Sequence, residues 1–239
     1  MKAAICGFSI WILVLSPPYL RSIKVALGIV GSLVNKIRVK ICGITSVADA
    51  QTAADAGADA IGLVFYASSP RAVSIAQARE IAASVGPFVT VVGLFVNAAD
   101  SYVRDVLANV GLNLLQFHGD ETREFCEQFG RPYMKAIRMR PELDVTRAIS
   151  EYPSAAAILL DAYRPGVPGG TGETFDWQRI PTQAARPIVL AGGLTPENVA
   201  SAIQATHIYA VDVSGGVESA PGKKDIQKVK QFIDNARHA

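Results

Sequence analysis

The sequence lacks any block of like charges. Its 23 Lys and Arg side chains nearly balance 21 Asp and Glu, which leaves a net charge of +2. No run of about five or six residues carries one sign only. Surfaces that follow a phosphate backbone need clustered positive charge. We therefore expect no nucleic-acid partner.

Cysteine is also scarce, with only Cys6, Cys42 and Cys126 in 239 residues. Three cysteines cannot all pair, and their spacing does not match that of metal ligands. No cluster of His, Asp and Glu has ligand spacing either. The pattern predicts a reduced, cytoplasmic protein that holds no metal.

A hydrophobic run long enough to cross a membrane is absent as well. The apolar stretch from Ala3 to Leu15 is shorter than the roughly 20 residues that a spanning helix needs. With Lys2 before it and Ser16 after it, the stretch imitates a secretory signal peptide, although no small-x-small cleavage site follows. The alternatives are an export signal, a membrane anchor and an appendage from an upstream start codon. The complete domain that follows favours the appendage, so we expect residues 1–36 to lie outside the fold and to bind no membrane.

Half of the residues are hydrophobic, and from Ile37 onward they follow a regular alternation. Short strand-like runs recur at intervals of roughly 20 to 30 residues, which is room for one strand, one helix and two loops. Eight such units in about 200 residues predict an α/β fold, a single-domain (β/α)8 TIM barrel over residues 37–239. An open Rossmann-like sheet is disfavoured, because no G-x-G-x-x-G follows the first strand. The runs start near Ile37, Ala60, Phe88, Asn113, Tyr133, Ala157, Pro187 and Ile208.

Helical periodicity appears between the strands. Thr195-Pro196-Glu197 places a capping hydroxyl, a proline and an acid where a helix would begin. Two other segments carry apolar stripes at helical spacing. The stripes are Val103, Val106, Leu107 and Val110 in the first and Ile226, Val229 and Ile233 in the second.

Glycine pairs follow the seventh and eighth expected strands. Gly192-Gly193 and Ser214-Gly215-Gly216 stand where barrel enzymes bind phosphate, at the loops after these two strands. Glycine lets backbone N–H groups approach phosphate oxygens, and a helix N-terminus nearby adds partial positive charge. These residues predict a small phosphorylated substrate.

Cys42 and Asp161 end the first and sixth expected strands. Period-two alternation places Lys40 and Cys42 on one face of their strand, and Asp161 on the same face as Leu159 in its own. Both side chains would then enter the barrel mouth, where a thiol and a carboxyl suit a proton shuttle. Lowering the thiol pKa by one unit takes about 1.4 kcal/mol, which we expect the Lys40 ammonium to supply.

Six motifs in this order closely resemble the phosphoribosylanthranilate isomerase family, over about Ile37 to the C-terminus. They are VKICGIT (Val39–Thr45), GLVFYASSPRAVS (Gly62–Ser74), LLQFHGDE (Leu114–Glu121), LLDAYRPGVPGGTGETFDW (Leu159–Trp177), LAGGLTPENV (Leu190–Val199) and VDVSGGVESAPGKKD (Val211–Asp225).

The resemblance implies a (β/α)8 barrel of tryptophan biosynthesis that needs no metal and no organic cofactor. It implies that Asp161 is the general acid that opens the ribose ring and that Cys42 is the base that removes the C2 proton. Arg71 matches the residue that binds the anthranilate carboxylate. Gln116, His118 and Asp212 also end strands, and we expect them to contact substrate.

Other phosphate-binding barrels are the alternatives. Indoleglycerol-phosphate synthase would need catalytic lysine and glutamate at strand ends, and the histidine-pathway isomerases use two aspartates. A membrane-tethered binding protein without turnover is a third alternative. The oligomeric state stays open between monomer and homodimer.

The connection from Ala162 to Thr174 is rich in glycine and contains two prolines. This composition excludes a helix or a strand. Because the connection lies at the catalytic end, we expect it to act as a lid that keeps water from the reaction.

Overall fold

The structure is a computed structural model that describes residues 36–163 and 174–239. The expectations for residues 1–35 and for residues 164–173 of the expected lid lie outside the described residues. Ile37–Ala239 forms one compact unit.

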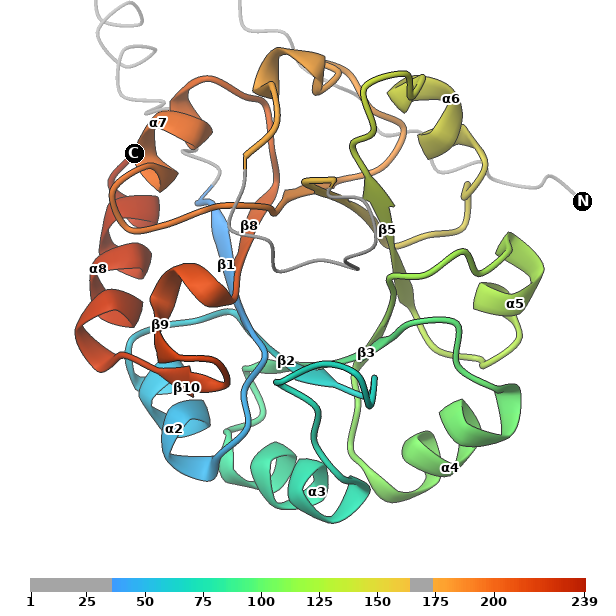
Figure 1. Cartoon of the computed structure of the whole chain (residues 1–239), viewed down its shortest axis with the longest axis vertical. Coiled ribbons are helices and arrows are strands. Elements are labelled where there is room, and N and C mark those ends of the chain that lie inside the picture. Colours follow the sequence, from blue (N-terminus) through green and yellow to red (C-terminus); the bar gives the residue numbers. More distant parts are fainter. Residues whose placement is uncertain (1–35, 164–173) are drawn as a thin grey trace, which may run out of the picture. The chain divides into compact units, whose positions relative to one another are not determined.

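Eight parallel strands close into a barrel in chain order, and β8 pairs with β1 to complete it. Figure 1 looks down this barrel, with the strands as the inner ring and the helices around them. The predicted TIM barrel is confirmed, and each strand begins within three residues of its expected start. The strands are β1 (Arg38–Cys42), β2 (Ala60–Val64), β3 (Thr90–Phe95), β4 (Leu114–Phe117), β5 (Tyr133–Arg138), β6 (Ala157–Asp161), β7 (Ile188–Leu190) and β8 (Ala210–Val213).

Helices connect most of the strands along the outside of the barrel (Figure 1). The α-helices are α2 (Val47–Asp55), α3 (Ile75–Ser84), α4 (Asp100–Asn109), α5 (Arg123–Glu127), α6 (Val145–Ser150), α7 (Val199–Gln204) and α8 (Ile226–Arg237). The shorter elements are the 3-10 helices η3 (Trp177–Arg179) and η4 (Gly215–Val217) and a hairpin of β9 (Glu218–Ala220) and β10 (Lys223–Lys224).

The helical predictions are confirmed in α4 and in part wrong elsewhere. Val103 and Val106 of α4 are buried, as the stripe predicts. In α8, however, Ile226 is 48% exposed, because the buried face turns through Phe232 instead. Helix α7 begins at Val199 rather than beside Thr195, with Asn198 at its N-cap.

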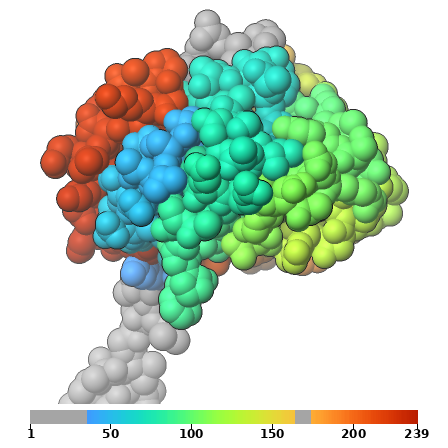
Figure 2. All heavy atoms as spheres, turned by 90° about the horizontal axis from the view of Figure 1, so that it is seen from below, coloured from blue at the N-terminus to red at the C-terminus, as the bar shows by residue number. Residues whose placement is uncertain are grey.

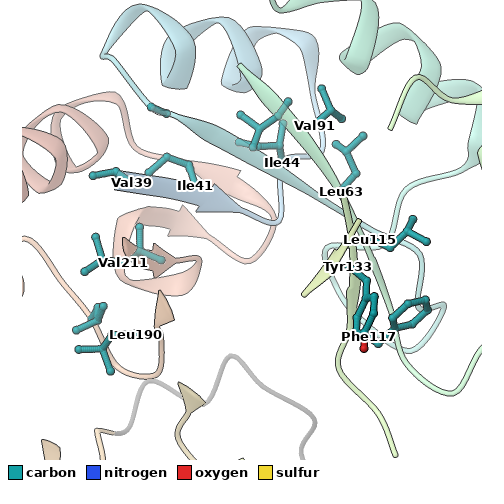
Figure 3. Packing of buried hydrophobic residues seen from close by; sticks show 14 of the residues in the cluster. Val39, Ile41, Ile44, Leu63, Val91, Leu115, Phe117, Tyr133, Leu190 and Val211 are labelled. Carbon is teal, nitrogen blue, oxygen red and sulfur yellow. The ribbon is translucent and has the colours of Figure 1, made fainter. Parts of the chain in front are cut away.

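Strand alternation divides the core into two layers. Outward side chains such as Val39, Leu115 and Val211 pack beneath the helices, as Figure 3 shows. Inward side chains such as Met134 and Leu159 fill the barrel interior. Cys42 and Asp161 occupy inward positions by the same alternation, so the barrel itself aims both at its mouth.

Figure 2 shows one face of the outer surface, where the first half of the barrel, coloured blue to green, lies beside the C-terminal segment in red. The turn between α3 and β3 carries Phe88, which is 96% exposed. This turn leads into the amino end of a strand, so it lies at the opposite end of the barrel from the strand-end loops. No helix in the described part of the chain is both long and apolar enough to cross a membrane.

Candidate active site

A cavity of about 380 Å³ opens at the carboxyl ends of the strands. Every residue that the sequence predicts for the site lines it. From β1 to β6 these residues are Cys42, Arg71, Gln116, His118 and Asp161, and from the last two strand ends they are Gly192, Gly193, Asp212, Ser214, Gly215 and Gly216. The barrel therefore brings together side chains that are far apart in the sequence.

Cys42 is buried at the end of β1, with 4% of its surface exposed. The neighbouring strand makes room for it. A Cβ at Gly62 of β2 would lie 2.7 Å from Cys42 Sγ and 3.1 Å from Lys40 Nζ. Since real Cβ contacts of 2.7 Å are not tolerated, Gly62 admits the thiol and the ammonium side by side. The sequence analysis did not single out Gly62, although it stands in one of the family motifs.

Lys40 forms a buried ion pair with Asp212 of β8, with 2.7 Å between Nζ and Oδ1. Burial alone would lower the pKa of Lys40, but Asp212 and Cys42 together raise it above the ordinary value, so Lys40 is a cation. Asp212, expected to contact substrate, is therefore already occupied by Lys40.

The expected lowering of the Cys42 pKa is wrong. Burial, the largest effect, raises the pKa of the thiol, and the Lys40 ammonium lowers it only in part. The Asp212 carboxylate adds to the rise, because it repels a second negative charge. In the chain without substrate, Cys42 is a protonated thiol at neutral pH.

Alkylation of Cys42 should therefore accelerate well into alkaline solution. Iodoacetamide reacts with the thiolate, so the rate should rise about tenfold per pH unit and still be rising at about pH 8.5, the ordinary thiol pKa. A chain that begins at Lys36 and carries Cys126→Ser has Cys42 as its only thiol. Mass spectrometry of that chain measures the rate, and Cys42→Ser is the blank. A rate that levels off near pH 7 would contradict the raised pKa.

Asp161 at the end of β6 heads a chain of buried side chains. Its Oδ2 lies 3.0 Å from His118 Nε2, and His118 Nδ1 lies 3.0 Å from Gln116 Nε2. The backbone of this loop is fixed from β5, because Arg138 donates to the carbonyl of His118 and Lys135 to that of Gly119. Side-chain hydrogen bonds thus connect Asp161, His118 and Gln116, all three of which the sequence predicts for the site.

The two glycine loops lie against each other. A Cβ at Gly216 would meet the carbonyl oxygen of Leu194 at 1.9 Å, and one at Gly192 would meet Ala162 N at 2.5 Å. Gly192 and Gly193 have φ of 83° and 62°, the left-handed region that favours glycine. Within the described part of the chain, neither donates its N–H to a carbonyl oxygen. This arrangement leaves backbone donors for an anion.

Asn198 supports the first of these loops. Its Nδ2 donates to the carbonyl of Gly193 and its Oδ1 accepts from Thr195 N. The Thr195 carbonyl accepts from Asn198 N and Val199 N, so residues 195–198 form a turn that leads into α7. The asparagine stands in a family motif, but the sequence analysis did not assign it.

Arg71 is held by a partner that the sequence analysis missed. Its Nε and Nη2 donate to the two carboxylate oxygens of Glu218 in β9, both at 2.8 Å. Lys224 of β10 donates to the same carboxylate at 2.9 Å. A guanidinium has five N–H donors, so Arg71 keeps three for a further anion. Glu218 therefore orients Arg71 without using all its donors.

An apolar wall covers one side of the cavity. Val64 and Leu94 of β2 and β3 pack with Cys42, and Tyr66 and Val96 extend the patch. Such a wall suits a flat, apolar group. These residues are ordinary strand residues in the sequence, so only the closed barrel shows that they face the cavity. In residues 36–163 and 174–239, no group of three or more His, Cys, Asp or Glu is placed to hold a metal ion.

Comparison with known proteins identifies the family. The family model of N-(5′-phosphoribosyl)anthranilate isomerase matches residues 39–235. The enzyme of that name from Cellvibrio japonicus is 68% identical over 203 residues, which are 85% of this chain and 94% of the relative.

Solved structures agree. Phosphoribosyl anthranilate isomerase from Thermotoga maritima matches with a TM-score of 0.78 and 44% identity, covering 85% of this chain and all of the other. A structure of such an enzyme in complex with reduced 1-(o-carboxyphenylamino)-1-deoxyribulose 5-phosphate matches with a TM-score of 0.73 and 42% identity, covering 85% of this chain and 100% of that one. This chain belongs to the N-(5′-phosphoribosyl)anthranilate isomerase family.

Proposed function

We propose that Cys42 and Asp161 perform the proton transfers by which this chain isomerises N-(5′-phosphoribosyl)anthranilate to 1-(2-carboxyphenylamino)-1-deoxyribulose 5-phosphate in tryptophan biosynthesis. The observation that carries the assignment is the placement of the two groups. A buried thiol on β1 and a buried carboxyl on β6 line one cavity from separate strands. A base and an acid so placed can act on one substrate from two sides.

The reaction then runs in two proton transfers. The Asp161 carboxyl gives its proton to the ribose ring oxygen, the C1–O bond breaks, and the anthranilate nitrogen supplies the electron pair for a Schiff base. The Cys42 thiolate takes the proton from C2, which gives an enolamine. The enolamine then tautomerises to the ketone, as its C2 hydroxyl loses a proton and C1 gains one. Atoms balance, because the product is an isomer of the substrate.

The shape of the cavity supports one orientation of the substrate. The backbone donors of Gly192, Gly193 and the loop after β8 suit the phosphate. The apolar wall of Val64 and Leu94 suits the aromatic ring, and Arg71 suits its carboxylate. The ribose then lies between Cys42 and Asp161, where the chemistry takes place.

An isomerase assay with the purified chain tests this function. Chromatography of the reaction with N-(5′-phosphoribosyl)anthranilate should show the ketone product accumulating without any added metal or cofactor. Absence of product under these conditions would overturn the function. Conversion of the ketone product onward to an indole would instead favour the synthase alternative.

Residues 1–36 should be dispensable for this activity. The eight strands and the described helices all lie after Lys36, so a chain that begins there should keep the kcat/KM and the melting temperature of the full chain. Steady-state kinetics and thermal unfolding measure both. A truncated chain that is inactive or insoluble would show that the N-terminal segment belongs to the fold.

We also infer a cytoplasmic enzyme that acts on a small diffusible phosphate ester, as a monomer or a homodimer. A balanced net charge and the absence of clustered positive charge support a partner other than nucleic acid. Fractionation of expressing cells tests the location, since an anchored protein would sediment with the membranes.

A further inference from the structure

Lys224 is a buried lysine that the proposed proton transfers do not use. It lies on β10, in the hairpin that follows the glycine loop after β8, and its side chain is 1% exposed. Burying an ammonium is costly unless acceptors receive its hydrogen bonds. Its Nζ donates to the carbonyl oxygen of Ser214 at 3.1 Å and to Oε1 of Glu218 at 2.9 Å. These two acceptors lead to different parts of the proposed site.

The Ser214 carbonyl belongs to the loop proposed to bind the substrate phosphate. The carbonyl of Ser214 and the N–H of Gly215 form one planar peptide group, so a contact that fixes the carbonyl also fixes the direction of the N–H. Val217 N donates to the same carbonyl at a longer distance, 3.4 Å. Within the described residues, the Gly215 N–H donates to no carbonyl oxygen. Lys224 thus helps to orient a backbone donor that is left for an anion.

The second acceptor holds the arginine proposed to bind the substrate carboxylate. Glu218 accepts from Nε and Nη2 of Arg71, both at 2.8 Å. This contact uses one edge of the guanidinium and leaves the edge between Nη1 and Nη2 for a second carboxylate. The Glu218 side chain is only 5% exposed. Lys224 and Arg71 are therefore held together by one buried carboxylate.

Arg71 and the loop after β8 also pack closely against each other. A Cβ at Gly43 would lie 2.5 Å from Arg71 Cδ and 2.8 Å from Ser214 Oγ. A Cβ at Gly215 would lie 3.3 Å from Arg71 Nη2. Because the arginine passes directly beside the loop, a small shift of either one changes the distance between the proposed carboxylate and phosphate sites.

We propose that Lys224 is a positioning residue that holds Arg71 and the loop after β8 at a fixed separation, so that both charged ends of one substrate bind at once. The role rests on the proposed function, which places the substrate carboxylate at Arg71 and the phosphate at the loop. Two linked anions bind more tightly than separate ones only where the two sites match their spacing. Lys224 itself is not among the residues that line the cavity, so it acts through Glu218 and Ser214.

The link can be removed without removing the hairpin. Lys228 of α8 donates to the backbone carbonyl of Glu218 at 3.0 Å, and the backbone N–H of Lys224 donates to Asp49 of α2 at 3.3 Å. Neither contact needs the Lys224 ammonium. In Lys224→Met, Glu218 still pairs with Arg71, so no buried charge is left alone. We therefore expect this variant to fold.

Ligand binding tests the link without turnover. Inorganic phosphate, anthranilate and the alcohol made by reducing the C2 ketone of the proposed product are each titrated into the full chain and followed by NMR. The alcohol carries both charged groups and cannot isomerise. Lys224→Met should weaken binding of the alcohol by about 5–150-fold more than the product of its effects on the two separate anions. Lys223→Met removes the same charge from the exposed neighbour on β10 and should show no such excess.

Glu218→Gln interrupts the same link at its middle, because an amide offers one acceptor oxygen where the Arg71 fork meets two. This variant should also show an excess, and adding Lys224→Met to it should add little. Effects of Lys224→Met that simply multiply, or an equal excess in Lys223→Met, would overturn the proposal. If Lys224→Met did not fold, Glu218→Gln would decide, since the absence of an excess there would overturn it equally.

Failure of the proposed function would give a different result. The unaltered chain would then bind the alcohol no more tightly than inorganic phosphate. Tight binding of the alcohol by the unaltered chain, with no excess loss in Lys224→Met, would refute the role of Lys224 and leave the proposed function in place.

Discussion

Cys42→Ser and Asp161→Asn should each lower kcat by about 10²–10⁴-fold, the usual contribution of a positioned acid or base. Serine keeps the size of the side chain, but its hydroxyl is far too basic to ionise. Asparagine keeps the shape of Asp161 and has no proton to give to the ring oxygen. Neither change touches the glycine loops, so both variants should still bind phosphate. Steady-state kinetics and phosphate binding measure the two effects separately.

Cys126→Ser is the matched control for the thiol. Cys126 lies buried in α5, outside the cavity, and burial raises its pKa to about 12. Its replacement should leave kcat within about twofold, since isosteric changes away from the chemistry have small effects. Full activity in Cys42→Ser would end the assignment of Cys42 as the base.

The pH profile gives the same test another readout. Activity should rise with pH as the Cys42 thiolate forms. Because burial raises the pKa of Cys42 above the ordinary value, the rising limb should lie in alkaline solution for the free enzyme. Bound substrate that excludes water or alters the charge near Lys40 changes the pKa of Cys42. The rising limb of kcat, which reports the substrate complex, therefore need not coincide with that of kcat/KM, which reports the free enzyme.

The barrel was predictable because its pattern is local. Each strand is a short apolar run, and alternation along it decides which side chain faces inward. Lys40 and Cys42 follow from that rule alone. The positions of the two glycine pairs after β7 and β8 were also predictable, and Gly192 and Gly193 there take φ values that favour glycine.

Contacts between distant residues were not predictable. Arg71 and Glu218 are 147 positions apart, and Lys40 and Asp212 are 172 apart. The sequence shows a cation near Cys42 but not the carboxylate opposite it or the depth of burial. For that reason the expected lowering of the Cys42 pKa was wrong, although Lys40 was correctly expected to act in the lowering direction.

The misplaced helix start has a similar cause. Thr195, Pro196 and Glu197 have the residue types of a first helical turn. Asn198, however, holds the loop by contacts to Gly193 and Thr195 at once. The segment therefore forms a single turn, with bonds from Asn198 N and Val199 N to the Thr195 carbonyl, and α7 itself begins at Val199.

Lys40→Met should cost about 3–5 kcal/mol in the free energy of unfolding, as removal of one partner from a buried ion pair usually does. Lys40 and Asp212 side chains are 6% and 9% exposed, so the change leaves a largely buried carboxylate without its partner. Methionine fills a similar volume, which separates the loss of charge from the loss of packing. Urea unfolding measures the cost.

Two further variants isolate the buried charge. Arg104→Met breaks an exposed pair with Asp100, at 52% and 47% exposure, and should cost no more than about 1 kcal/mol. Lys40→Met combined with Asp212→Asn removes the stranded carboxylate and should recover part of the stability. If Lys40→Met lowered the free energy of unfolding no more than Arg104→Met, the Lys40–Asp212 pair would contribute no more to stability than an exposed pair.

The same substitution should also change the thiol. Lys40 is the principal group that lowers the pKa of Cys42, while Asp212 and burial raise it. Removing the ammonium leaves only the smaller effect of Lys224 to oppose burial and Asp212, so alkylation of Lys40→Met at pH 8.5 should be slower than that of the unaltered chain. Adding Asp212→Asn removes one of these effects and should restore part of the rate. Stability and reactivity would then respond together to one buried pair, because the ion pair between β1 and β8 is also the electrostatic environment of the Cys42 thiol.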